Sequence, residues 1–329
     1  MATAESSRRP WGRILSRAWS EFNRDGCTDL AAALTYYSVL ALFPAILALV
    51  SLLGLLGSGP DAVGFITDVL GRLLPADSAE SVISFIDGLS KTSGIGWGVA
   101  VGLLGALWSA SGYVGGFSRA MNRIYDVPEG RPVWKLRPTM FAVTVLTIAL
   151  LAIALVIVAS SGPVASAIGG AVGLGDQALT LWSWAKWPIL VLVVVCNVAL
   201  LYYATPNVRQ PRFRVVSAGA FVAIAIVAVA SAGFGFYVAN FSSYNQTYGA
   251  VAGAVVLLLW LWLTNLALLF GGELDAELER DHQLHAGLAA EEHLLLPLRD
   301  DSASSKKAMA REETIADAKL LRRRIARDS

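Results

Sequence analysis

Long apolar runs separated by short polar and charged connections dominate the pattern of this 329-residue chain. The clearest run covers residues 250–270, where apolar side chains occur on every side of a helix. A helix of about 20 apolar residues is long enough to cross the hydrocarbon core of a bilayer. An apolar surface on all sides also suits lipid better than the core of a soluble domain. The run therefore predicts a membrane-spanning helix.

The same pattern recurs along the chain and predicts six membrane spans. We place these spans at about 30–57, 95–113, 138–161, 182–204, 215–238 and 250–271. The expected fold class is all-α, a polytopic membrane protein with six transmembrane helices in a membrane domain at 30–275. Small residues at every fourth position of the second span favour close packing against a neighbouring helix.

Two other segments are apolar on one helical face only, which is typical of helices at a membrane surface. Residues 1–29 form a basic segment in which Trp11, Leu15 and Trp19 recur at helical spacing, with arginines on the other flank. Such a helix suits an anionic membrane surface, although a plain surface helix would show the same pattern. Residues 58–94 are expected to form two shorter amphipathic helices on or just under the membrane.

Lysine and arginine alternate between successive connections. The N-terminal segment, the second connection and the fourth connection carry five, five and three of them, and the first carries two. The third has none before Lys186, and the fifth has none. Positive residues concentrate on the cytoplasmic side of membrane proteins. The alternation therefore predicts six spans with both termini in the cytoplasm.

The last segment, 276–329, differs in composition from the rest of the chain. Charged residues make up 16% of the whole sequence and its mean hydropathy is +0.58, whereas soluble domains usually carry about 25% charge. Segment 276–329 nevertheless mixes ten basic with eleven acidic residues. We expect a cytoplasmic tail, partly disordered, with a helix through Leu296, a flexible Ser/Lys stretch and a final helix.

The sequence offers little for catalysis. The span centres contain no charged residue, which disfavours a pump built on buried carboxylates. Cys27 and Cys196 are expected to be free thiols, and all three histidines lie in the tail. No Walker loop, GxSxG, HExxH or paired-cysteine motif occurs. We therefore expect no enzymatic activity, no cofactor, no metal site and no nucleic-acid partner.

An amide-rich, uncharged turn joins the fifth and sixth expected spans and contains Asn240, Asn245, Gln246 and Tyr248. Irregular backbone inside a membrane is tolerated where protein or water satisfies its polar groups. The turn could therefore dip back into the bundle and line one end of a path. A short extracytoplasmic turn fits the pattern equally well.

Two carboxylates, Glu273 and Asp275, mark the expected cytoplasmic end of the sixth span. Negative charge is unfavourable at a helix C-terminus, so these groups are expected to have partners. The arginines of the second and fourth connections lie on the same predicted side. A structural ion pair is the main interpretation, and a gate that opens when the pair breaks is the alternative.

The remaining candidate residues belong to the first span and to the basic connections. They are Tyr36, Tyr37, Arg119, Asn122, Arg123, Asn207 and Arg209. The arginines among them are expected to attract anionic lipid headgroups.

Four segments give the chain a family resemblance. They are AAALTYYSVLALFPAILAL (31–49), FSRAMNRIYDVPEGRP (117–132), YYATPN (202–207) and the segment from TYGAVAG to GGELDAELER (247–280). In these segments the chain resembles the YihY/virulence factor BrkB family of bacterial inner-membrane proteins. The resemblance implies six spans, a multi-pass location in the bacterial inner membrane, and a role in the cell envelope. Other members have been linked to serum resistance and to export of envelope or lipid precursors.

Three functional hypotheses follow. The leading one is a non-enzymatic membrane protein that transports or handles an amphiphilic, lipid-like envelope component, with anionic membrane lipids as partners and homo-oligomerisation left open. The alternative is a scaffolding protein that recruits partners through its cytoplasmic tail. A remote third is the ribonuclease BN activity that the family was once assigned, a label regarded as mistaken. This sequence has no clustered His/Asp set to hold catalytic metals.

Overall fold

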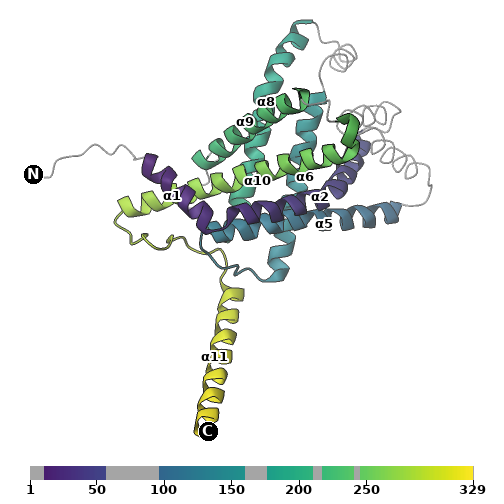
Figure 1. Ribbon diagram of the computed structural model, residues 1–329. Helices are drawn as coiled ribbons and strands as arrows, with labels where there is room; N and C mark the ends of the chain where they lie inside the picture. The colour runs from purple at the N-terminus through teal and green to yellow at the C-terminus, as the bar shows by residue number, and fades with distance from the viewer. Residues whose placement is uncertain (1–10, 57–95, 160–175, 210–216, 241–244, 329) are drawn as a thin grey trace, which may run out of the picture.

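The computed structural model describes residues 11–56, 96–159, 176–209, 217–240 and 245–328 (Figure 1). These residues form helices and connecting turns without a β-strand, apart from one isolated antiparallel bridge between Val208 and Leu298. The helices are α1 (Trp11–Arg24), α2 (Cys27–Leu56), α5 (Gly96–Ile124), α6 (Val133–Ala159), α8 (Asp176–Ala204), α9 (Ala218–Asn240), α10 (Asn245–His285) and α11 (Ser302–Asp328). The predicted all-helical class is confirmed for this part of the chain.

Helix α10 is the central element of the bundle, because it packs against α9, α2 and α1. Helix α2 also packs on α5, and α6 on α8. The core lies where α2, α5, α8 and α10 meet, around the fully buried Phe117, whose ring stacks with those of Tyr113 and Tyr202. Figure 1 shows α11 projecting away from this bundle.

Four helices of the described part are long and apolar enough to cross a membrane. They are Val133–Val158, Gln177–Ala204, Ala218–Phe236 and Gly253–His285, and they coincide with the third to sixth expected spans. Cys27–Leu42, in the first expected span, is a shorter apolar helix. The count of six spans and the side of the termini stay predictions, and the surface helices expected at 58–94 lie outside the described residues.

Several helices extend beyond the expected limits of the spans. Helix α5 continues through Ile124, so the second expected span and the first part of the basic segment after it form one continuous helix. At the other end of the chain, α10 runs through the boundary expected at 275/276 and ends at His285. Gly287 adopts a φ of 75°, and the Leu288 N–H donates to the Gln283 carbonyl. This left-handed cap is a common way to end a helix, and it rules out the helix expected through Leu296.

Residues 286–301 run back along the bundle, and the final helix begins where a flexible stretch was expected. Ala290 and Leu294 are buried, and the Arg209 N–H donates to the Pro297 carbonyl. Helix α11 starts at Ser302, whose N–H and hydroxyl both donate to the Asp300 carboxylate. A side-chain acceptor at this position satisfies a backbone donor that the first helical turn leaves unpaired. The Ser/Lys stretch is therefore helical.

Candidate functional site

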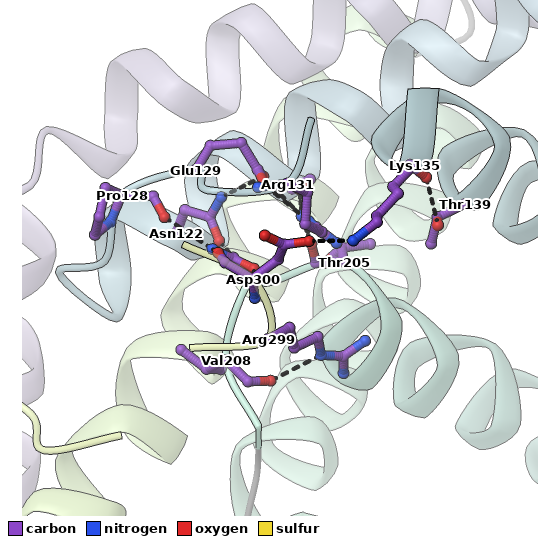
Figure 2. A network of polar contacts seen from close by, with 12 residues as sticks. Asn122, Pro128, Glu129, Arg131, Lys135, Thr139, Thr205, Val208, Arg299 and Asp300 are labelled. Atoms are coloured by element: carbon purple, nitrogen blue, oxygen red, sulfur yellow. Dashed lines mark hydrogen bonds and ion pairs between the residues drawn. The ribbon is translucent and has the colours of Figure 1, made fainter. Parts of the chain in front are cut away.

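A buried polar cluster joins three parts of the chain that are distant in sequence: the end of α5 with the connection to α6, the residues just after α8, and the part of the tail just before α11 (Figure 2). We call this cluster the polar junction and define it by Ser118, Asn122, Glu129, Arg131, Thr205, Asn207 and Asp300. Two of its members, Asn122 and Asn207, were candidates from the sequence.

Asn207 is the central residue of the polar junction and is completely buried. Its N–H donates to Asn122 Oδ1 at 2.7 Å, and its Nδ2 donates to the carbonyls of Pro128 at 3.0 Å and Asp300 at 2.8 Å. Its Oδ1 accepts the Asp300 N–H at 3.3 Å. Because buried polar groups are costly unless paired, these contacts fix the relative positions of all three segments.

Arg131 and Glu129 form the charged part of the polar junction. The Arg131 side chain is 6% exposed and binds Glu129 with two parallel bonds, Nε to Oε1 at 2.8 Å and Nη2 to Oε2 at 2.7 Å. Nη2 also donates to the Thr205 carbonyl at 2.8 Å. Burial raises the pKa of Glu129, but the hydrogen bonds and charge of Arg131 outweigh burial and hold that pKa below its usual value.

The tail adds a second ion pair beside the junction. Lys135 Nζ lies 2.6 Å from the Asp300 carboxylate, and this hydrogen bond, together with those from Ser302, holds the pKa of Asp300 well below its usual range. A side chain at Gly130 would overlap the backbone of Asp300 and Asp301. The connection and the tail thus approach each other at backbone distance, which only glycine permits at that position.

The two carboxylates at the end of the sixth expected span contact partners that are distant in the chain, and Glu273 lacks the arginine expected for it. Glu273 is 1% exposed and accepts a hydrogen bond from the Cys27 thiol at 3.4 Å, and no arginine of the described part forms an ion pair with it. Asp275 accepts the Gly219 N–H at 2.8 Å, at the start of α9. The first turn of a helix has unpaired N–H groups and a partial positive charge, so the N-terminus of α9 provides a favourable partner for Asp275.

The arginine candidates remain accessible at the surface. Arg119 lies over the Tyr37 ring at 5.6 Å from its centroid and donates to the Tyr37 hydroxyl at 3.3 Å. The neighbouring Tyr36 is 62% exposed and makes an edge contact with Tyr37. Arg123 and Arg209 are also exposed. Arg119, Tyr36 and Tyr37 thus form one surface group, although they come from helices distant in sequence.

Residues 241–244 of the amide-rich turn lie outside the described residues. Asn240 ends α9 and Asn245 begins α10, while the surroundings of the Gln246 and Tyr248 side chains are not described. Whether this turn re-enters the membrane therefore stays an open prediction.

Sequence reasoning missed several residues of the polar junction. Glu129 and Arg131 lie in the PEGRP part of a segment that carries the family resemblance, and Arg131 otherwise entered only the count of positive residues. Asp300 and Cys27 gave no local signal, because each acts on a partner far away in the chain.

The bundle of long apolar helices and its buried polar junction define a helical integral membrane protein. Within that class, the chain belongs to the Virulence factor BrkB family, whose sequence pattern matches residues 18–293. This assignment agrees with the resemblance found in the sequence. No solved structure has significant similarity to the chain.

Curated relatives are similar over most of this chain. The ribonuclease-like protein YfkH of Bacillus subtilis is 30% identical over 271 residues, which is 82% of this chain and 97% of that protein. A UPF0761 membrane protein of Alkalilimnicola ehrlichii is 33% identical over 258 residues, covering 77% of this chain but 55% of the relative. Another, from Pseudoalteromonas atlantica, is 29% identical over 265 residues, covering 78% of this chain and 82% of the relative.

Proposed function

We propose that this protein is a non-enzymatic protein of the bacterial inner membrane that transports or handles an anionic, lipid-like component of the envelope. The observation that carries the proposal is the pair of exposed Arg119 and half-buried Tyr37, with exposed Tyr36 beside it. Tyrosine rings favour the headgroup level of a membrane, and arginine attracts anionic headgroups. Together they offer an anion contact and an adjacent apolar surface.

The geometry around Tyr37 supports this interpretation. A Cβ at Gly116 would lie 3.0 Å from the Tyr37 ring, so the ring sits directly against the backbone of α5. Because Arg119 is one turn further along the same helix, its guanidinium stacks on a ring whose position is fixed. A preordered cation of this kind loses little side-chain entropy when it binds an anion.

Arg119→Gln tests the proposal in liposomes containing the full chain and a labelled anionic lipid. We expect the wild-type protein to accelerate movement of the lipid between leaflets, and the variant to slow that movement about fivefold, as loss of about 1 kcal/mol of headgroup attraction implies. Arg311→Gln on the exposed helix α11 is the matched control and should retain the wild-type rate. If folded wild-type protein gives no acceleration, the transport proposal fails.

One observation favours the second candidate, a scaffold that recruits partners. Helix α11 is 27 residues long, and its side chains are exposed along almost its whole length. A mainly polar helix without a packing face is unusual unless something else contacts it. The ribonuclease function has no such support, because the described residues contain no group of three His, Cys, Asp or Glu placed to hold a metal.

Truncation can distinguish a transport function from a scaffolding function if it leaves the polar junction intact. We expect a chain ending at Asp301 to unfold close to the wild-type denaturant concentration and to keep its lipid activity. No described side chain of α11 is buried, and the truncation removes the Ala303 N–H bond to the Gly130 carbonyl and the Ser302 bonds to Asp300. A chain ending at His285 should be less stable, because it also lacks Leu294 and the Asp300 backbone groups that pair with Asn207. Loss of the cellular phenotype in the Asp301 truncation, with lipid activity intact, would favour the scaffold.

A further inference from the structure

A groove lies between α1 and the last turns of α10, away from the polar junction. It has a volume of about 330 Å³, within the range of about 300–1,000 Å³ found for small-molecule sites. Arg13, Arg17 and Arg280 contribute guanidinium groups to its walls, and Ile14 and Leu284 contribute apolar surface. The groove therefore combines cations with a small apolar wall.

The carboxylates of the groove are already engaged. Glu277, with a side chain 3% exposed, binds Arg17 Nε at 3.1 Å and Arg280 Nε at 2.9 Å. Asp281 lies 3.5 Å from the His285 ring. Two guanidiniums thus share one carboxylate, and a third, Arg13, forms no ion pair with any described residue. Apart from His285, three positive and two negative groups line the groove, which therefore has a surplus of positive charge.

The backbone holds both paired arginines in place. Arg280 Nη1 donates to the Ala290 carbonyl at 3.2 Å, and Arg17 Nη2 donates to the Glu291 carbonyl at 3.2 Å. The tail segment after α10 therefore closes one side of the groove and orients the cations. Preordered guanidinium groups are the usual means of binding phosphate, because their donors match its oxygens.

The position of the groove sets the kind of ligand that can reach it. Trp19 lies on the opposite flank of α1 and packs its ring against Phe270. Arg13 and Arg17 instead lie beside the charged last turns of α10. The exposed side chains of Trp11, Leu15 and Trp19 form an apolar stripe on that opposite flank. This amphipathic arrangement suits a helix at the membrane surface, with its arginines directed to headgroups or solvent.

We propose that this groove binds a phosphate group, carried either by a lipid headgroup or by a soluble phosphate ester. Arg13 and Arg17 contact the phosphate oxygens, and the groups next to the phosphate pack on Ile14 and Leu284. The site is separate from Arg119 and does not depend on lipid transport.

Binding measurements on the full chain test this site. In detergent, calorimetry with glycerol 3-phosphate should show saturable binding, which Arg13→Gln weakens at least about tenfold, as loss of a charge-assisted bond implies. Arg24→Gln is the matched control, because Arg24 lies on the same helix, is 59% exposed and pairs with Glu21 outside the groove. In nanodiscs, native mass spectrometry of the same variants measures how many phosphatidylglycerol and how many phosphatidylcholine molecules the protein retains.

A third variant is expected to raise the phosphate affinity, and this distinguishes an effect on binding from misfolding. Asp281→Asn removes one negative charge from the groove wall and should tighten binding, whereas a merely destabilised protein would bind less. A loss confined to the soluble phosphate assigns the site to a free ester, and a loss confined to the lipid assigns it to a headgroup. The proposal is overturned if neither probe binds, or if Arg13→Gln and Arg24→Gln behave alike.

Discussion

Gly219→Ala is expected to separate α9 from α10 and to lower the free energy of unfolding by about 3 kcal/mol, the upper end of the usual cost of overpacking. The new Cβ would overlap the Gly271 carbonyl oxygen and lie 2.6 Å from the Asp275 carboxyl carbon. Both obstacles belong to α10, and the first is backbone, so a change of rotamer cannot relieve the overlap. The helices must move apart, which also strains the bond from the Gly219 N–H to Asp275.

Urea unfolding of the purified protein in detergent, followed by tryptophan fluorescence, measures this loss. Gly233→Ala is the control, because Gly233 lies on the same helix and no atom occurs within 4 Å of the Cβ position. It should be neutral or slightly stabilising, since alanine favours a helix more than glycine does. Equal stability of Gly219→Ala and Gly233→Ala would show that α9 and α10 do not cross at this position.

The membrane helices could be predicted from the sequence because their length and apolar surface are set by the bilayer itself. The apolar runs of α6, α8 and α9 could be identified without knowing which helices pack against them. Their ends were less predictable, because tertiary contacts decide them. Helix α10 continues past its apolar run and ends at His285, just before the left-handed Gly287, and α11 begins early because Asp300 accepts the Ser302 donors.

The candidate site was predictable only in part, for a similar reason. Asn122 and Asn207 attracted attention as polar residues in the basic connections, and the fold brings Asn122 Oδ1 to 2.7 Å from the Asn207 backbone nitrogen. The partners of Glu273 and Asn207 lie far away in the chain, at Cys27 and Asp300. A local pattern carries no signal of such pairings. The expectation that Glu273 pairs with arginine rested on charge alone, and the fold instead placed it beside a thiol.

Arg131→Ala is expected to cost about 3 kcal/mol of unfolding free energy, the lower end of the range for breaking a buried ion pair. Glu129, 24% exposed, would lose both bonds from the guanidinium and keep only the Asn122 amide and a backbone N–H. The Thr205 carbonyl would keep the Ser118 hydroxyl but lose its bond from Arg131. Because Asn122 also binds Asn207, the loss should spread to the docked tail, and hydrogen exchange at residues 297–303 should rise.

Lys135→Ala is the matched control, because it removes a nearby cation, at the start of α6, from an exposed site. Its side chain is 48% exposed, and exposed ion pairs contribute at most about 1 kcal/mol. Arg131→Lys should fall between the two, since it keeps the charge but loses the planar fork that binds both Glu129 oxygens. If Arg131→Ala and Lys135→Ala destabilise the protein equally, the buried pair does not hold the junction together, and the contacts of Asn207 must do so alone.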